Sequence, residues 1–195
     1  PMSARRQRQM CIRDRHLETK KKLFLVDAYA LIFRGYYAFI KNPRINSKGV
    51  DTSAIMGFTN SLFDVIKREK PDYIAVCFDK GGSHDRTKIF KEYKANRDET
   101  PEAIKIAVPY IEKILKSLNI AIVVKEGYEA DDIIGTIAKK AKQKNLKTYM
   151  VTPDKDFAQL VEKDIYMYRP VFGGGYETWG IDEVLKKFEI NKTNF

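Results

Sequence analysis

The sequence predicts an α/β domain with a mostly parallel sheet flanked by helices. From Lys20 onward, short apolar runs alternate with longer amphipathic stretches, which is typical of strands and helices in a parallel sheet covered on both faces. In addition, three of the apolar runs are followed within three residues by an aspartate, as expected where parallel strands end at one edge.

Each element follows from its own pattern. We expect strands at 23–26, 73–78, 121–124, 148–151 and 165–168. We expect helices at 52–69, 101–118, 130–144 and about 181–188. Pro71 stops the first of these helices, and glycines at 173–175 mark a turn before the last. No internal repeat or linker interrupts this order, so the sequence predicts one domain.

Length and composition exclude some classes of protein. The chain has 195 residues, 44% of them hydrophobic and 32% charged, which suits one soluble globular domain. It has neither an apolar run of the roughly 20 residues that span a bilayer nor a signal peptide, so we expect no membrane partner. Of its two cysteines, Cys77 falls in an apolar run, where a reduced, buried thiol is expected. We therefore expect a cytoplasmic protein.

The net charge of +10 favours a polyanionic partner such as nucleic acid, although solvated surface lysines could also produce it. Part of this charge lies in residues 1–19, which hold five arginines and two acids. These residues have no helical or strand periodicity, and the first buried strand begins only after them. We expect a disordered leader, a cloning remnant or translated non-coding sequence, and exclude it from the fold.

Asp27, Asp79 and Asp154 each follow an apolar run that we expect to be a strand. The carboxyl ends of parallel strands lie along one edge of a sheet, where ligands bind, so the three side chains should converge. Any one of these aspartates could instead be a loop residue or a helix cap. Three of them at equivalent positions favour a shared site.

Two denser acidic clusters extend this set. In the motif GYEADD, Glu129 and Asp132 stand three residues apart at the start of a helix and share a face, with Asp131 adjacent. In TPDKD, Asp154 and Asp156 flank a lysine. The helix dipole also favours acids in a first turn, which is a purely structural explanation for the first cluster. If all of them face one cleft, seven carboxylates meet there: Asp27, Asp79, Glu129, Asp131, Asp132, Asp154 and Asp156.

So many carboxylates in one cleft require cations. Two carboxylates about 4 Å apart repel by roughly 1 kcal/mol in water and by about 4 kcal/mol at an effective dielectric near 20. His16 lies in the leader and His84 in a polar loop, so no histidine completes a zinc-type site. Oxygen ligands alone suit Mg²⁺, or Mn²⁺ in its place. Two such ions about 4 Å apart would stabilise the attacking and leaving oxygens of phosphodiester hydrolysis, so the sequence predicts a nuclease.

Five motifs resemble those of the 5′-nuclease domain of bacterial DNA polymerase I. They are VDAYALIFRGYYAF at 26–39, FD at 78–79, YKANR at 93–97, GYEADDIIGTIA at 127–138 and TPDKDFAQLV at 152–161. The resemblance spans about residues 22–190. It implies a PIN-like fold and a Mg²⁺-dependent 5′-3′ exonuclease and flap endonuclease that cuts DNA at a 5′ flap, nick or free 5′ end. In the parent polymerase it would serve DNA replication and repair, including removal of RNA primers.

The resemblance also implies roles for individual residues. The seven acids match the family's metal ligands, and the implied catalytic set is Asp27, Asp79, Asp131, Asp154, Arg86 and Lys94. The implied nucleic-acid contacts are Arg34, Arg86, Tyr93, Lys94 and Arg97. The basic residues could instead be solvated surface side chains, and Tyr93 a partly buried loop aromatic. Lys94 and Arg97 fall in the polar, basic segment 80–100, which we expect to form a flexible arch over the cleft.

The sequence departs from the family pattern in one respect. In the family, two more aspartates and a helical hairpin that grips duplex DNA follow the matched region, and this chain ends at Phe195 before both. We therefore expect residues 20–195 to be a 5′-nuclease N-terminal domain truncated before the hairpin, with an incomplete second metal site and weak or no cleavage. We also expect a monomer, with polymerase domains in the full-length chain.

Three alternatives remain open. A PIN-domain ribonuclease would share the fold and the acid geometry, but such chains lack both the basic segment and the full GYEADD cluster. A free-standing flap endonuclease cannot be separated from a polymerase-linked domain by this sequence. The chain could also be a non-catalytic nucleic-acid-binding module with vestigial acids, an interpretation that failure to bind Mn²⁺ would favour.

Overall fold

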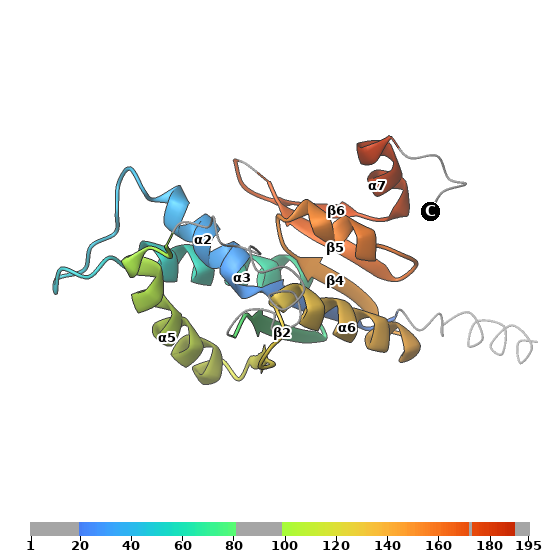
Figure 1. The fold of residues 1–195 in the computed structure, drawn as a ribbon, viewed down its shortest axis with the longest axis horizontal. Helices are drawn as coiled ribbons and strands as arrows, with labels where there is room; N and C mark the ends of the chain where they lie inside the picture. Colours follow the sequence, from blue (N-terminus) through green and yellow to red (C-terminus); the bar gives the residue numbers. More distant parts are fainter. Residues whose placement is uncertain (1–19, 81–98, 172, 190–195) are drawn as a thin grey trace, which may run out of the picture.

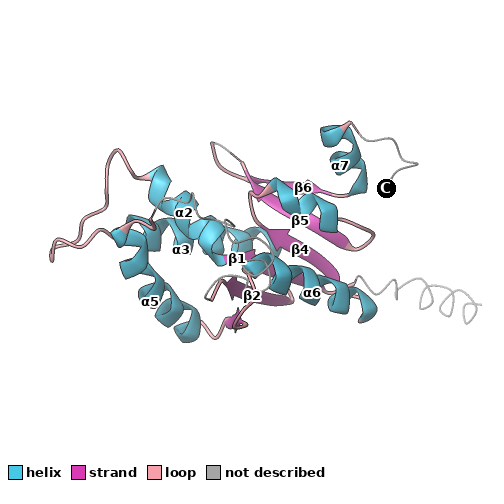
Figure 2. Ribbon diagram, in the orientation of Figure 1, coloured by secondary structure: helices cyan, strands magenta, loops and turns pink. Residues whose placement is uncertain are grey.

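The computed structural model describes residues 20–80, 99–171 and 173–189; the predicted leader and nearly all of the predicted arch lie outside the described residues. A six-stranded sheet forms the centre, with helices packed on both faces (Figures 1 and 2). The strands are β1 (Lys22–Asp27), β2 (Tyr73–Phe78), β3 (Ala121–Val124), β4 (Lys147–Val151), β5 (Ile165–Pro170) and β6 (Tyr176–Trp179). The helices are α2 (Ala28–Ala38), α3 (Ser53–Glu69), α5 (Glu102–Ser117), α6 (Ala130–Gln143), α7 (Ile181–Phe188) and the 3₁₀ helix η1 (Lys155–Leu160). None of the helices in the described part of the chain combines the length and the apolar character needed to cross a bilayer.

The strand order is β3-β2-β1-β4-β5-β6, and every neighbouring pair is parallel except β5 with β6. From β1 the chain extends the sheet through β2 to β3, and then crosses back to place β4 on the other side of β1. β1 and β4 therefore form a topological switch point, where a crevice opens beyond the carboxyl ends of the strands. The predicted mostly parallel sheet flanked by helices is confirmed.

Alternate residues of the central strand β1 belong to different layers of the core. Leu23 and Leu25 pack with α6 and η1 on one face, whereas Phe24 and Val26 pack with α2, α3 and α5 on the other. All four side chains are buried, because helices cover both faces of the sheet. Burial on both faces explains why the strand is an unbroken apolar run in the sequence.

The structure adds three elements that the sequence analysis does not predict: α2, η1 and β6. Helix α2 packs on both the sheet and α3, and most of its residues are apolar or aromatic. It therefore lacks the distinct polar face by which an amphipathic helix is recognised in a sequence. The six residues of η1 and the four of β6 are too few to establish a period. The other predicted strands and helices are present, with ends within two residues of those predicted.

Helices α2 and α3 cross in close contact at two glycines. A Cβ atom built on Gly57 would lie 2.3 Å from the Cα atom of Gly35, and one built on Gly35 would lie 3.0 Å from backbone atoms of Gly57. Neither position accepts a side chain without moving a helix. The crossing fixes the position of α2, which begins directly after Asp27 at the carboxyl edge of the sheet.

Gly57→Ala should lower the free energy of unfolding by about 2 to 3 kcal/mol, because the added methyl group meets backbone atoms rather than a mobile side chain. Urea denaturation measures the change. Gly135→Ala in α6 is the matched control, since its Cβ atom would meet only the Leu160 side chain, at 3.3 Å, and alanine favours the helix. If the two variants proved equally stable, the close crossing would be wrong.

Candidate functional site

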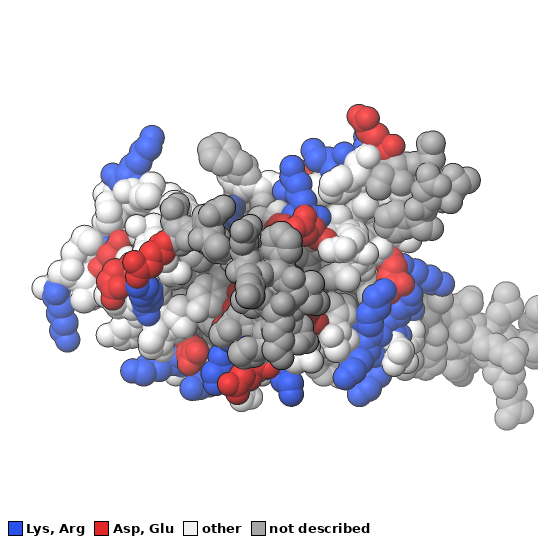
Figure 3. Space-filling model, in the orientation of Figure 1, with Lys and Arg blue, Asp and Glu red and all other residues white. Residues whose placement is uncertain are grey.

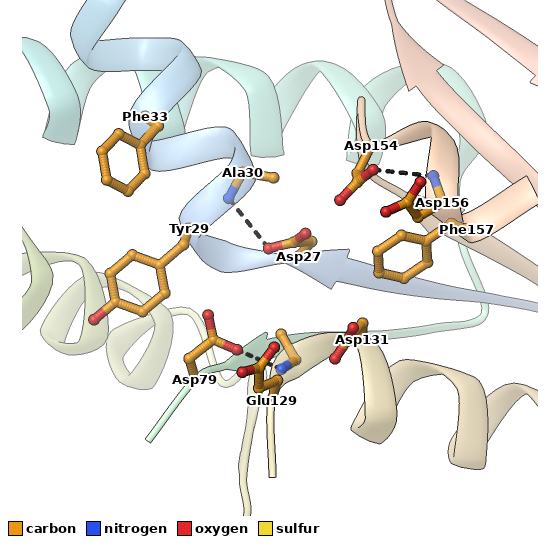
Figure 4. Close-up of a pocket in the computed structure, with 11 residues that line it drawn as sticks. Asp27, Tyr29, Ala30, Phe33, Asp79, Glu129, Asp131, Asp154, Asp156 and Phe157 are labelled. Carbon is orange, nitrogen blue, oxygen red and sulfur yellow. Dashed lines mark hydrogen bonds between the residues drawn. The ribbon is translucent and has the colours of Figure 1, made fainter. Parts of the chain in front are cut away.

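A cavity of about 260 Å³ opens at the carboxyl edge of the sheet, beside the switch point between β1 and β4 (Figure 4). The ends of β1 and β2, the start of α2, the start of α6, and η1 all contribute to its lining. Six acidic side chains line it: Asp27, Asp79, Glu129, Asp131, Asp154 and Asp156. The structure therefore brings together six of the seven acids that the sequence analysis selects.

Asp27 ends β1 and caps the first turn of α2. Its Oδ1 atom accepts a hydrogen bond from the backbone N–H of Ala30 at 3.1 Å, and its Oδ2 atom accepts one from the Thr152 hydroxyl at 3.2 Å. The side chain thus satisfies a helix N-terminus and also reaches the end of the neighbouring strand β4. Asp27 is therefore both a helix cap, as the sequence allowed, and part of the cavity wall.

Asp79 follows β2 and faces the start of α6. Its Oδ1 atom accepts a hydrogen bond from the Ala130 N–H, so a carboxylate from one strand binds the positive end of a helix dipole. Glu129 precedes the same helix and is only 5% exposed, and Asp131 lies in its first turn. Three acids are thereby grouped around one helix N-terminus.

Asp154 and Asp156 lie at the start of η1, and in Figure 4 Asp27 separates them from the three acids grouped at α6. Asp154 caps η1, because its Oδ1 atom accepts a hydrogen bond from the Asp156 N–H at 3.0 Å. Both side chains are exposed, unlike the buried Glu129. The cavity therefore has an enclosed side at α6 and an open side at η1.

Burial, followed by the negative charges of Asp79 and Asp154, raises the pKa of Asp27 from 3.8 to about 6. The hydrogen bonds from Ala30 and Thr152 act in the opposite direction, since they favour the ionised form. Part of the Asp27 side chain opens onto the cavity, while protein surrounds it on the other sides. Burial and the charge of Asp79 likewise raise the pKa of Tyr29 on the cavity wall.

Two of the selected residues lie elsewhere. Asp132 lines a neighbouring hollow between α6 and η1, and it accepts a hydrogen bond from the Glu129 N–H at 3.3 Å. Arg34 is not part of the cavity lining; its guanidinium donates a hydrogen bond to the Val171 carbonyl at 2.8 Å. Arg86, Tyr93, Lys94 and Arg97 lie outside the described residues.

The uncharged residues of the site could not be identified from the sequence. Tyr29, Phe33 and Phe157 are the aromatic residues of the lining, and the buried Thr152 donates a hydrogen bond to Asp27. Aromatic residues in a run such as YALIF are ordinary core residues by pattern. Their only distinguishing signal is that each lies one to six residues from an acidic position.

The donor atoms of the cavity suit a hard divalent cation. Its lining offers carboxylate oxygens, and no histidine or cysteine from the described residues joins them. Across residues 20–80, 99–171 and 173–189, no three acidic, histidine or cysteine side chains already stand around a single point that could hold an ion. Mg²⁺ is usually bound by one or two carboxylates and keeps several waters, so the residues present fit this ion.

Comparison with known proteins assigns the chain to a family. The sequence model described as "5'-3' exonuclease, N-terminal resolvase-like domain" matches residues 22–189. The chain belongs to this family. The matched region includes every described strand and helix, and it confirms the family predicted from the five sequence motifs.

Relatives within the 5′-3′ exonuclease family are longer than this chain. A 5′-3′ exonuclease of Aquifex aeolicus (strain VF5) is 37% identical over 170 residues, which cover 87% of this chain and 57% of that protein. The DNA polymerase I of Caldicellulosiruptor bescii is 39% identical over 145 residues, which cover 74% of this chain and 17% of the polymerase. The chain thus spans little more than half of the first relative and a small part of the second.

Solved structures share the fold at lower sequence identity. The T5 5′-exonuclease with bound zinc has a TM-score of 0.64 and 19% identity, covering 85% of this chain and 60% of that one. The bacteriophage T5 flap endonuclease in a complex with DNA and metal ions has a TM-score of 0.62 and 20% identity, covering 87% of this chain and 61% of that one. These similarities confirm the predicted PIN-like fold class.

Asp27→Asn should stabilise the protein at high pH in the absence of divalent cations. A carboxyl group whose pKa is raised by folding adds no penalty below pH 4; it progressively destabilises the fold between about pH 4 and pH 6, and the full penalty is present above pH 6. The difference between a pKa of 3.8 and one of about 6 corresponds to roughly 3 kcal/mol, so the variant should gain about 2 to 3 kcal/mol at pH 8 and almost nothing at pH 4. Urea denaturation in EDTA at both pH values measures this difference.

Asp156→Asn, at an exposed position on the same cavity, is the control and should change stability little at either pH. Adding Mg²⁺ at pH 8 should stabilise the wild-type protein more than Asp27→Asn, because a cation favours ionised carboxylates. If Asp27→Asn changed stability equally at pH 4 and pH 8, the pKa of Asp27 would not be raised by burial in the folded protein.

Proposed function

We propose that the chain hydrolyses DNA phosphodiester bonds as the 5′-3′ exonuclease and flap endonuclease domain of a DNA polymerase I, using divalent cations. One observation carries the proposal: six carboxylates from β1, β2, α6 and η1 line a single cavity at the switch point of the sheet. Family membership and the names of the relatives support the same activity.

The acids alone cannot bind DNA, because a phosphate would meet several negative charges at the cavity. Bound divalent cations would change the electrostatic potential at the cavity from negative to positive. They would also stabilise the charge that develops on the attacking and leaving oxygens. The protein's contribution is to fix the ligands: Asp27 through Ala30 and Thr152, and Asp79 through Ala130. Rigid ligands need little reorganisation during the reaction, which is the main source of electrostatic catalysis.

Mg²⁺ is the cation that we propose, with Mn²⁺ as a substitute and two ions in the complete site. The oxygen-only donor set supports hard cations, and both the enclosed acids at α6 and the exposed pair at η1 offer ligands.

DNA with a 5′ flap, nick or free 5′ end is the proposed substrate. The net charge of +10 favours a polyanion, and lysine and arginine side chains stand around the rim of the face in Figure 3, with acidic side chains between them. Contacts of DNA with Arg34, Arg86, Tyr93, Lys94 and Arg97 stay predictions, as do action on RNA primers, a monomeric state and a cytoplasmic location.

Asp154→Asn should reduce Mg²⁺-dependent cleavage of a 5′-flap DNA by about 100-fold or more in the full-length protein, because a cation ligand is lost. Asparagine also caps helices, so η1 should stay folded. DNA affinity measured in Ca²⁺ should change less than about threefold, since affinity comes mainly from basic residues. Single-turnover cleavage and fluorescence anisotropy measure the two quantities.

The control is Asp64→Asn, which removes an equal charge from the exposed face of α3, where Asp64 pairs with Arg68 at 2.6 Å. It should leave cleavage unchanged. Near-normal cleavage by Asp154→Asn would exclude Asp154 from the site. DNA binding by the wild-type protein without any cleavage would favour a non-catalytic binding module, and faster cleavage of RNA would favour a PIN-domain ribonuclease.

A further inference from the structure

Thr152 is a fully buried polar residue at the centre of the switch point. It directly follows β4, the strand that pairs with β1, and its exposed fraction is 0%. It does not line the cavity. A threonine there could simply fill space at a strand end, so its hydrogen bonds decide what it does.

The Thr152 hydroxyl joins acids from two different elements. It donates a hydrogen bond to the Oδ2 atom of Asp27 at 3.2 Å, and its oxygen accepts one from the backbone N–H of Asp154, also at 3.2 Å. Asp154 in turn accepts the N–H of Asp156 through its side chain. One chain of hydrogen bonds therefore runs from the end of β1 through Thr152 to both acids of η1.

A hydroxyl group is required for this connection. It supplies one donor and two acceptor sites, so it can bind a carboxylate oxygen and a backbone N–H at the same time. Valine has nearly the same shape as threonine but offers neither. In its place, Asp27 would lose one of its two hydrogen-bond donors, and the partly buried Asp154 N–H would lose its acceptor.

We propose that Thr152 is a positioning residue: its hydroxyl links the Asp27 carboxylate to the backbone N–H of Asp154, so that the carboxylates of both residues face the same bound cation. This inference rests on the proposed function. Thr152 touches neither the cation nor the DNA; it acts only through the two acids. Groups that orient metal ligands in this way typically change metal affinity by about 10- to 100-fold when they are removed.

Two matched pairs of variants test the hydroxyl apart from the packing. Wild type and Thr152→Val differ in the hydroxyl at nearly constant volume; Thr152→Ser and Thr152→Ala differ in the same group, and both lack the γ-methyl. Thermal denaturation in EDTA identifies the folded variants. Mn²⁺ titration followed by electron paramagnetic resonance gives the affinity for the cation without any need for cleavage, and single-turnover cleavage of flap DNA follows.

Folded Thr152→Val and Thr152→Ala should bind Mn²⁺ at least about 10-fold more weakly than wild type and Thr152→Ser, and cleavage should fall in the same order. If Thr152→Val does not fold, the serine and alanine pair still gives the comparison. Equal Mn²⁺ affinity within either pair would overturn the inference and leave the proposed function standing. A wild-type protein that binds no Mn²⁺ would overturn both.

Discussion

Six carboxylates lie close together in one cavity at the carboxyl edge of the sheet, where burial and mutual repulsion destabilise their ionised forms. The surrounding hydrogen bonds and backbone positions offset part of this free-energy cost. Burial and the nearby charges of Asp79 and Asp154 raise the pKa of Asp27 to about 6, so the uncharged form is favoured more than in water. Hydrogen bonds from Ala30, Thr152 and Ala130 offset part of the cost. A divalent cation would remove most of the rest, which couples cation binding to stability.

The rigidity of the sheet is what keeps these charges close. β1 is covered on both faces and pairs with β2 and β4, so Asp27 and its neighbours at the strand ends cannot separate without disrupting the core. The same arrangement made the site predictable. A buried parallel strand is an unbroken apolar run, and Asp27, Asp79 and Asp154 could be assigned to one edge because each follows such a run.

Other features could not be predicted because tertiary packing decides them. Asp131 and Asp132 are adjacent acids in one motif and both line the hollow beside η1, but the rotation of α6 brings only Asp131 to the cavity as well. Arg34 is turned toward the Val171 carbonyl by the β5–β6 connection, a long-range contact that local sequence does not encode. Thr152 carries no charge, and only its hydrogen bonds distinguish it from an ordinary buried threonine.

The proposed function depends on the binding of divalent cations by the carboxylates at the switch point of the sheet. A crystal structure of the protein grown with Mn²⁺ tests it most directly, because anomalous scattering locates the ion independently of the protein coordinates. We expect anomalous peaks inside the cavity, with oxygen ligands from acids on at least two of the elements that line it. Mn²⁺ bound only at other places on the protein, with no ion at the acids of the cavity, would show that these carboxylates are not a cation site.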